Sequence, residues 1–343
     1  MVRRALALAW LVSCTSVALG DTPDEGDVAP VASSEDAELN EQARGAFRIE
    51  NEWKLSVPDD LVEPFREWLR ERYGTGEGSI LPELGPDFTV KFSDEHFTDR
   101  YFDNPRLEVL ASQGGIRHRT RRNLEDAAHD RKHGRQLVQL KLRRPGDQEL
   151  NRTEIKFEVN PPEEARSELD RHPLIGLVDR DQQQAFIDTA ARFGFDAREM
   201  SNTITLEQRR WRVYISKGGK AFSTLTLDEV SSYFVGWGVR FTELEIELNE
   251  VAYTEANRAG QEAMEQVSQR LADDIFAAFP AIKQDQTPKY NKVYDALAAK
   301  VPAFRTFLLH RDLILTLGLL GVVGGVVGGA ALWRRRAAKR PAA

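Results

Sequence analysis

Residues 49–55 read Ile49-Glu50-Asn51-Glu52-Trp53-Lys54-Leu55. Polar and apolar side chains alternate along this stretch, which predicts a β-strand because successive strand side chains point to opposite faces. Glu50, Glu52 and Lys54 therefore share one face. Like charges two residues apart on a strand repel each other and are rarely selected for solubility alone. The stretch thus predicts a strand with one charged face, which either binds a ligand or faces the solvent.

The same alternation recurs along the chain, with the charge changing sign between strands. Short strands are predicted at residues 115–121, 137–143, 152–158 and 243–248. The charged faces of these strands carry Arg117, Arg119 and Arg121; Lys141 and Arg143; Arg152, Glu154, Lys156 and Glu158; and Glu243, Glu245 and Glu247. Two further strands are predicted around Trp211, flanked by Arg210 and Arg212, and at Leu225 to Asp228. Arg209 directly precedes the first of these, so a register shifted by one residue stays open there.

Each kind of charged row has a preferred ligand. Rows of carboxylates suit hard divalent cations such as Mg²⁺ or Mn²⁺. Rows of arginine and lysine suit polyanions, and the guanidinium fork matches phosphate oxygens. Both rows in one domain indicate a site for a metal-complexed phosphate chain. The alternative is a sheet with a solvated charged face.

Amphipathic helices are predicted between and after the strands, at 59–72, 256–279 and 289–299. Their apolar residues recur at helical spacing, as expected of helices that cover a sheet. A sheet that turns its charged face inward has to close into a barrel wide enough for water and ligand. The expected arrangement is therefore a polar barrel with helices outside it.

These residues resemble the CYTH, or triphosphate tunnel metalloenzyme, superfamily. The Glu-x-Glu-x-Lys signature is present at residues 50–54, and residues 101–105 resemble the family's Tyr-Phe-Asp-Thr-Pro element. An Arg-x-Arg strand follows, as in the family. Asp228 matches a late acidic position, and residues 243–247 match the Glu-x-Glu-x-Glu metal strand. Residues 289–292 resemble the Lys-x-x-Lys of the VTC-type polyphosphate polymerases.

The resemblance covers residues 45–300 and implies a fold class, α+β, with an eight-stranded antiparallel β-barrel, the triphosphate tunnel, and flanking helices. It implies Mg²⁺ or Mn²⁺ as cofactor and three sets of site residues. The catalytic set is Glu52, Glu245 and Lys54; the phosphate-binding set is Lys54, Arg117, Arg119, Lys141, Arg143, Arg152, Arg210, Arg212, Lys289 and Lys292; the metal-binding set is Glu50, Glu52, Glu154, Asp228, Glu243, Glu245 and Glu247. Lys156 departs from the family, which has a second acidic residue there, and segments 73–97 and 160–200 are longer than in minimal members.

The two ends of the chain are expected to lie outside this domain. Residues 1–20 have the composition of a secretory signal peptide, and residues 11–14, Leu-Val-Ser-Cys, resemble a bacterial lipobox. Either cleavage after Gly20 or lipidation of Cys14 fits. Residues 21–44 are acidic and predict a disordered linker. Residues 301–312 form a juxtamembrane segment before the membrane span.

Residues 313–333 are an uncharged run of 21 residues, close to the ~20 that cross a bilayer. The arginine-rich tail 334–343 predicts a cytoplasmic C-terminus and an extracytoplasmic, periplasmic domain on a single-pass membrane protein. Glycine pairs spaced GxxxG within the run suggest a homodimer through the membrane helix.

Composition narrows the function further. The net charge of −7 and pI of about 5.6 disfavour a general nucleic-acid coat, and no nucleic-acid partner is expected. Cys14 is the sole cysteine, which excludes an intrachain disulfide framework and cysteine-based metal sites. No Walker loop or Gly-x-Ser-x-Gly motif is present. His129 and His133 lie in a polar run and are interpreted as solvated loop residues.

The expected function is metal-dependent hydrolysis of tripolyphosphate, longer polyphosphate or an organic triphosphate by a membrane-anchored domain. Two alternatives stay open. One is a non-catalytic polyphosphate or organophosphate binding module, which retention of the glutamates on the metal strand disfavours. The other is a polyphosphate polymerase-like enzyme, which needs a nucleotide donor that the predicted topology places on the other side of the membrane.

Overall fold

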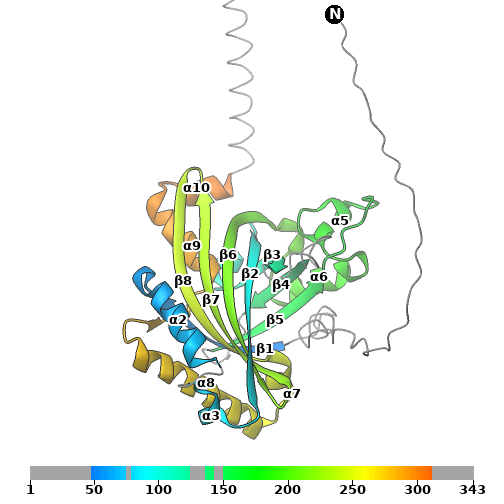
Figure 1. Ribbon diagram of the computed structural model, residues 1–343. Coiled ribbons are helices and arrows are strands. Elements are labelled where there is room, and N and C mark those ends of the chain that lie inside the picture. The colour runs from blue at the N-terminus through cyan, green and yellow to red at the C-terminus, as the bar shows by residue number, and fades with distance from the viewer. Residues whose placement is uncertain (1–47, 75–78, 124–135, 143–149, 311–343) are drawn as a thin grey trace, which may run out of the picture.

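The computed structural model describes residues 48–74, 79–123, 136–142 and 150–310 (Figure 1). The segments predicted as signal peptide, acidic linker, membrane span and basic tail lie outside these residues, as do Arg143, His129 and His133. None of the helices in the described ranges has the length and apolarity needed to span a bilayer.

Eight antiparallel strands form the centre of the molecule. They are β1 (Arg48–Val57), β2 (Phe88–Asp103), β3 (Gly115–Asn123), β4 (Gln136–Leu142), β5 (Asn151–Glu158), β6 (Ser201–Lys217), β7 (Lys220–Phe234) and β8 (Trp237–Leu248). The strand order is β5-β4-β3-β2-β6-β7-β8-β1, and β1 pairs with β5 through Glu50 opposite Arg152. That last pairing closes the sheet into a barrel, which confirms the predicted eight-stranded antiparallel barrel in an α+β fold. A two-residue strand, β9 (Lys283–Gln284), adds to β1.

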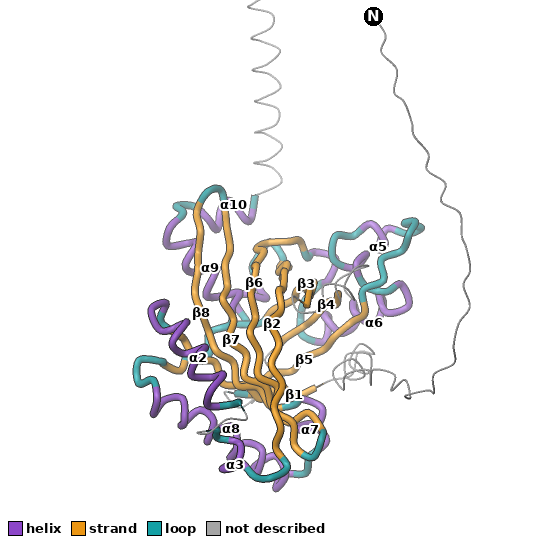
Figure 2. Tube along the Cα trace, in the orientation of Figure 1, coloured by secondary structure: helices purple, strands orange, loops and turns teal. Residues whose placement is uncertain are grey.

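Helices cover the outside of the barrel (Figure 2). The longer ones are α2 (Val62–Arg72), α6 (Gln183–Arg192), α8 (Arg258–Ala278) and α9 (Lys289–Lys300). The shorter ones are α3 (Leu81–Leu84), α4 (Glu108–Ala111), α5 (Glu168–Arg171), α7 (Glu250–Glu255) and α10 (Phe304–Leu309), with 3-10 turns at Asp59–Leu61, Ile175–Leu177, Arg180–Gln182 and Ala197–Glu199. The three predicted helices appear as the turn 59–61 with α2, α8 and α9.

Three apolar clusters lie between the helices and the outer barrel wall. The first joins α2 and α8 to β1 and β6–β8, for example through Phe65 and Leu55. The second joins α6 to β3–β5, and Phe186 meets Phe157 edge to face at 5.3 Å between ring centroids. The third places α9 and α10 over one end of β6–β8. Because the apolar alternate residues all face these clusters, the charged alternate residues face the interior of the barrel.

Two parts of the fold escaped the sequence-based expectation. Strand β2 is 16 residues long and begins at Phe88, within the segment 73–97 that is longer than in minimal family members. The extension at 160–200 holds α5, α6 and the 3-10 turns around them, and its apolar side chains close the second cluster over β3–β5. It therefore supports one wall of the barrel.

Candidate functional site: a charged tunnel inside the barrel

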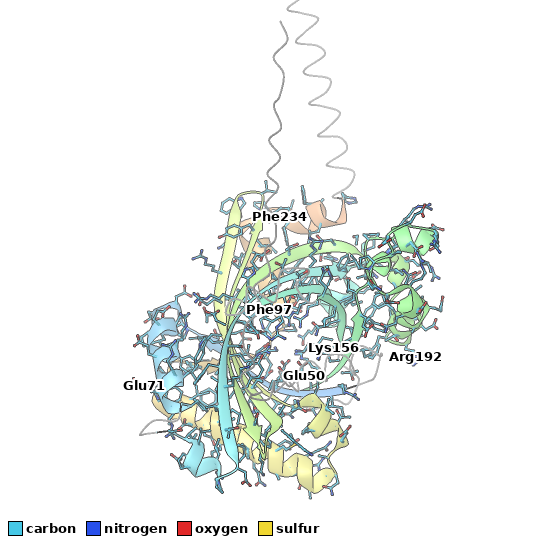
Figure 3. All side chains as sticks on the ribbon, turned by 45° about the vertical axis from the view of Figure 1, so that its right-hand side comes forward. Glu50, Glu71, Phe97, Lys156, Arg192 and Phe234 are labelled. Atoms are coloured by element: carbon cyan, nitrogen blue, oxygen red, sulfur yellow. The ribbon has the colours of Figure 1, made fainter. Side chains whose placement is uncertain are left out.

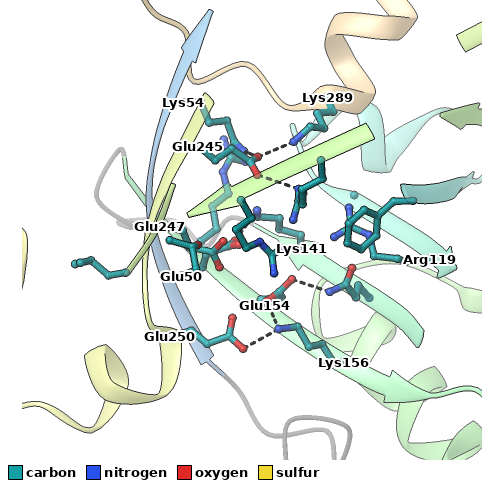
Figure 4. Close-up of a pocket in the computed structure, with 18 of the residues that line it drawn as sticks. Glu50, Lys54, Arg119, Lys141, Glu154, Lys156, Glu245, Glu247, Glu250 and Lys289 are labelled. Atoms are coloured by element: carbon teal, nitrogen blue, oxygen red, sulfur yellow. Dashed lines mark hydrogen bonds and ion pairs between the residues drawn. The ribbon is translucent and has the colours of Figure 1, made fainter. Parts of the chain in front are cut away.

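The barrel encloses a cavity of about 300 Å³ whose walls carry side chains from all eight strands and from α7 and α9 (Figure 4). This volume is at the lower end of the range for small-molecule sites. The view in Figure 3 looks toward the barrel with Glu50 and Lys156 near its opening and Phe97 on the opposite wall.

The acidic wall is built by β1 and β8. Their antiparallel register puts Glu52 opposite Glu247 and Lys54 opposite Glu245. The Lys54 ammonium lies 2.5 Å from the Glu245 carboxylate and 3.1 Å from that of Glu52. The Glu-x-Glu-x-Lys strand and the Glu-x-Glu-x-Glu strand therefore form one continuous charged surface.

The carboxylates of this wall differ in their electrostatic balance. Burial alone would raise the pKa of Glu245, but the charges of Lys289, Lys54 and Arg210 outweigh it and hold that pKa well below its ordinary value. The pKa of Glu50 is shifted in the opposite direction. Burial, together with the neighbouring Glu52, raises its pKa well above the ordinary value, and Lys141 at 2.6 Å offsets only part of this. Negative charge is thus under-compensated around Glu50.

The basic wall is built by β3 and is held in place by β2. Buried Asp99 on β2 accepts hydrogen bonds from Arg117 at 3.0 Å and from two nitrogens of Arg119 at 2.7 Å each. The ring of Phe97 packs against the guanidinium of Arg119, 4.5 Å from the ring centroid, and that of Arg210, at 4.8 Å. Arginine rows of this kind are costly to bury, and a shared carboxylate and a ring face are what stabilise them.

Strand β6 completes the basic wall and resolves the open register. Arg210 donates two hydrogen bonds to Asp228, at 2.7 and 2.6 Å, and Arg212 donates to the Tyr214 hydroxyl at 2.7 Å. Arg209 is exposed on the outer face, where it pairs with Asp94 at 2.7 Å. The register with Arg210 and Arg212 inside the barrel is therefore the one the chain adopts.

Helix α9 contributes two lysines from its first turn. Lys289 is buried, with its ammonium 2.8 Å from the carboxylates of Asp228 and Glu245 and 2.7 Å from that of Glu243. Lys292 lies 2.8 Å from the same Glu243. The glutamates expected to bind a metal are thus held by ammonium groups in this structure.

Lys156, which stands where the family has an acidic residue, forms ion pairs of its own. The Lys156 ammonium lies 3.0 Å from Glu154 and 2.7 Å from Glu250, the first residue of α7. Burial raises the pKa of Glu250 to about 8, with Glu154 adding to the rise and Lys156 opposing it. An additional cation therefore lines the tunnel together with an additional buried carboxyl group.

The donor set suits a divalent metal in chemistry, because the tunnel offers carboxylate oxygens, which Mg²⁺ and Mn²⁺ prefer. Within the described ranges, however, no three Asp, Glu, His or Cys side chains converge as a ready metal site. Burial and the charges of Glu52, Glu154 and Glu247 raise the pKa of Glu50, so a further cation beside this carboxylate would be favourable.

The structure brings most of the expected site residues to one cavity. Those on its wall are Glu50, Lys54, Arg117, Arg119, Lys141, Arg152, Glu154, Arg210, Arg212, Glu245, Glu247 and Lys289. Glu52, Asp228, Glu243 and Lys292 lie one contact behind them, each in an ion pair with a wall residue or with a partner of one. The roles assigned to these residues stay predictions.

Sequence reasoning missed the contribution of β2. Glu95, Phe97 and Asp99 occupy alternate positions that face the barrel interior, and each contacts an arginine. The tyrosine element that follows has a structural role: Tyr101 stacks on Tyr290 at 4.9 Å, and Asp103 accepts from the backbone nitrogens of Val109 and Leu110. Glu250 was also missed, because it follows the strand whose alternation carried the signal.

Comparison with known proteins gives one family. The CYTH domain profile matches residues 79–274, more than half of the chain. A comparison with curated proteins found no significant match.

Solved structures with similar folds were found at low identity. HpAC1 from Hippeastrum, an adenylyl cyclase candidate with a dominant triphosphatase activity, is 14% identical, with a TM-score of 0.39 and coverage of 74% of this chain and 98% of its own. The Pct1 RNA triphosphatase of S. pombe is 14% identical, with a TM-score of 0.32 and coverage of 74% and 93%. The PH1819 protein of Pyrococcus horikoshii is 20% identical, with a TM-score of 0.35 and coverage of 65% and 89%.

Proposed function

The chain belongs to the CYTH domain family, within the triphosphate tunnel metalloenzymes, and on that basis we propose that it hydrolyses a triphosphate. The proposed substrates are inorganic tripolyphosphate, longer polyphosphate or an organic triphosphate, with Mg²⁺ or Mn²⁺ as cofactor. The observation that carries this proposal is the meeting of an acidic wall and an arginine wall within one closed cavity.

The chemistry follows from where the charges lie. A triphosphate is densely anionic near neutral pH, so its terminal phosphorus repels nucleophiles, and catalysis consists mainly of positioning and charge screening. Arg117 and Arg119 on β3, with Arg210 on β6, face the cavity from one side and would bind the phosphate oxygens. Lys54 and Lys141 face it from the other side. A chain held between both walls has its terminal phosphorus fixed for in-line attack by water.

Carboxylates of the acidic wall would take the proton that water loses as the bond from the terminal phosphorus to its bridging oxygen breaks. Glu50, Glu52, Glu245 and Glu247 would also hold the metal. A bound divalent cation would supply charge neutralisation at the phosphate oxygens. Binding it there requires that lysine partners such as Lys141 turn from carboxylate to phosphate.

The test is phosphate release from tripolyphosphate by the full chain with Mg²⁺ or Mn²⁺, and with EDTA. Glu245→Gln should abolish turnover while leaving some affinity, because the lost charge matters most in the transition state. Arg119→Ala should weaken binding by about 1.5–3 kcal/mol, the size of a hydrogen bond to a charged group.

Two matched controls are available outside the tunnel. Arg209→Ala changes an arginine next to Arg210 that faces outward, and Glu262→Gln changes an exposed glutamate on α8. Both should leave turnover and affinity unchanged. Wild-type behaviour of Glu245→Gln and Arg119→Ala in the same assays would show that the charged interior has no part in function.

A second candidate function, phosphate-chain binding without turnover, is favoured by one observation. The carboxylates Glu243 and Glu245 are already neutralised by Lys289 and its neighbours, and no preformed metal group is present in the described ranges. Tight, metal-independent binding of tripolyphosphate with no phosphate release would support this candidate. Synthesis of polyphosphate from ATP would instead place the protein with the polymerases.

We further propose that the run 313–333 anchors the domain in a membrane with the tunnel on the extracytoplasmic side. Its uncharged length and the arginines that follow support this orientation. A homodimer through the GxxxG pairs of that run is part of the same proposal.

A further inference from the structure

The tip of the β7–β8 hairpin exposes a group of large apolar side chains. Tyr233, Val235 and Trp237 have exposed fractions of 67%, 75% and 51%. They occupy one turn of chain, between the last residues of β7 and the first of β8. Large exposed apolar side chains gathered at one hairpin tip are candidates for an interaction surface.

The β6–β7 hairpin, whose turn lies at the other end of β7, shows that a hairpin tip of this fold can be polar. Both hairpins have two-residue turns in which each central residue has a positive φ, the geometry that favours Asn-Gly or Gly-Gly. At the β6–β7 turn the chain uses Gly218 and Gly219 between two lysines. At the β7–β8 turn it places Val235, at a φ of 44°, between Phe234 and Trp237.

A β-branched residue is poorly suited to that backbone conformation. An exposed valine there therefore gains nothing for the isolated domain, neither burial nor turn stability. Contact with an apolar partner outside the domain would give this side chain the burial that the domain does not provide.

The position of the hairpin identifies that partner. Phe234, just before the turn, meets two rings of α10 in edge-to-face contacts, Phe304 at 4.8 Å and Phe307 at 4.7 Å between ring centroids. Figure 1 shows α10 seated at this end of β7 and β8. Helix α10 ends at Leu309, and the uncharged run 313–333 begins four residues later in the sequence. The tip thus lies where the chain leaves the domain toward the proposed membrane anchor.

The charges around the tip also fit a lipid surface. Lys300 is exposed and donates from its ammonium to the Gly238 carbonyl at 2.9 Å, directly behind the tip. Arg240 on β8 and Arg305 on α10 are exposed as well, and the charges of Arg305 and the acidic Asp295 of α9 both act on Tyr294. Tyrosine and tryptophan favour the membrane interface, and basic side chains beside them are attracted to anionic headgroups.

We infer that the β7–β8 tip, through Tyr233, Val235 and Trp237, inserts into the headgroup region of the bilayer that holds the 313–333 run. The inference rests on the proposed membrane anchor and is independent of the proposed triphosphatase chemistry. The domain would then contact the membrane twice, through the anchor and through the shallow insertion of the tip. Two contacts would hold the barrel in one orientation relative to the membrane.

A probe at Val235 tests this directly. The full chain, carrying Cys14→Ser and Val235→Cys, is labelled with an environment-sensitive fluorophore and reconstituted into phosphatidylcholine–phosphatidylglycerol vesicles. Nitroxide lipids quench it from shallow and deep positions in separate samples. The matched control is Lys220→Cys at the opposite, glycine-turn hairpin, with the same label. A second variant adds Trp237→Ser to the Val235→Cys chain.

The expected result is a blue-shifted emission at position 235 that shallow nitroxides quench more than deep ones, because interfacial groups sit roughly 5–10 Å into the bilayer. The label at position 220 should stay unshifted and unquenched. Trp237→Ser should reduce the quenching at 235 and leave phosphate release unchanged.

Equal, solvent-like emission from positions 235 and 220 in the vesicles would overturn the inference. Energy transfer between labels at 235 without lipid quenching would overturn it too, by assigning the tip to a second copy of the chain. If the chain did not float with the vesicles in a density gradient, both the proposed membrane anchor and the proposed contact of the tip would be refuted. Lipid quenching at 235 in a chain that releases no phosphate would support the contact and refute the triphosphatase proposal alone.

Discussion

Asp99 is the residue whose replacement most directly tests how the charged interior is held together. It is fully buried on β2 and accepts four hydrogen bonds, one from Arg117, two from Arg119 and one from Gln208 at 2.6 Å. Burial alone would raise its pKa, but the charges of Arg117 and Arg119 outweigh burial and lower the pKa below its ordinary range. The carboxylate is therefore charged at neutral pH and balances two guanidinium groups.

Asp99→Asn keeps the shape of the side chain and removes the charge. Breaking a buried ion pair from one side costs about 3–5 kcal/mol, since the remaining charge stays buried without compensation. For a domain of 150–250 residues, each kcal/mol corresponds to about 2–4 °C in Tm, so the variant should melt roughly 6–20 °C below the wild type. Arg117 and Arg119 each keep about a tenth of their side chain exposed, and this access to water favours the lower half of that range.

The measurement is thermal unfolding followed by circular dichroism at pH 7, with Asp94→Asn as the matched control. Asp94 lies on the same strand but faces outward, where it pairs with the half-exposed Arg209. Its loss should cost about 0–1 kcal/mol, as for other surface pairs. If Asp99→Asn melted as close to the wild type as Asp94→Asn does, the arginine wall would not depend on this carboxylate and the reasoning would be refuted.

The pH dependence has a defined sign. A carboxyl group whose pKa is lower in the folded chain than the ~3.9 of the unfolded chain stabilises the fold above that unfolded value. The stabilisation is lost as the pH falls through the folded-state pKa. The difference in Tm between wild type and Asp99→Asn should therefore be constant from neutral pH to about pH 5 and should narrow below about pH 4.

The remaining predictions concern the tunnel and the topology. Lys156→Met should weaken tripolyphosphate binding by about 1.5–3 kcal/mol in calorimetry if this ammonium contacts phosphate, whereas Lys220→Met, on an exposed turn, should not. Unchanged affinity in Lys156→Met would make the lysine only a counter-ion for Glu154 and Glu250. Protease added to intact cells or spheroplasts should remove the domain and spare a C-terminal tag, because positively charged flanks stay cytoplasmic. A domain protected until lysis would invert the proposed orientation and favour the reactions that use cytoplasmic ATP.

The strands that the sequence predicted are those in which one face is charged and the other apolar. In β1, Glu52 and Lys54 alternate with Trp53 and Leu55, which meet an outer cluster, and in β8 the glutamates alternate with leucine and isoleucine. Period-two contrast of this kind is readable without a structure. The barrel interior followed from it, because the charged face had to be the inner one.

Strand β2 lacks that contrast. Its inner face mixes Glu95, Phe97 and Asp99, while its outer face carries Asp94, His96 and Thr98. Because both faces carry polar side chains, polar and apolar residues do not alternate along the sequence of β2. The strand nevertheless pairs with β6 along its whole length. The partners that β2 supplies to the arginines were therefore invisible in the sequence, and so was Glu250, whose contact with Lys156 depends on how α7 packs against β1.

The ion pairs of the tunnel have a consequence for how ligands enter it. In the described structure Glu52, Asp228, Glu243 and Glu245 are each within salt-bridge distance of a lysine, and Asp99 is bonded to two arginines. The cations that would bind phosphate are thus the same groups that neutralise the carboxylates.

A triphosphate alone would have to draw these cations away and leave buried carboxylates uncompensated, which is costly. A divalent metal held by the carboxylates would supply the compensating charge and free the lysines for the phosphates, so each ligand would lower the cost of binding the other. Coupling of this kind is reciprocal by thermodynamic necessity. The ion pairs of the tunnel would therefore favour the proposed metal complex of a phosphate chain over the bare polyanion, with Glu50 among the carboxylates where a metal would add compensating charge.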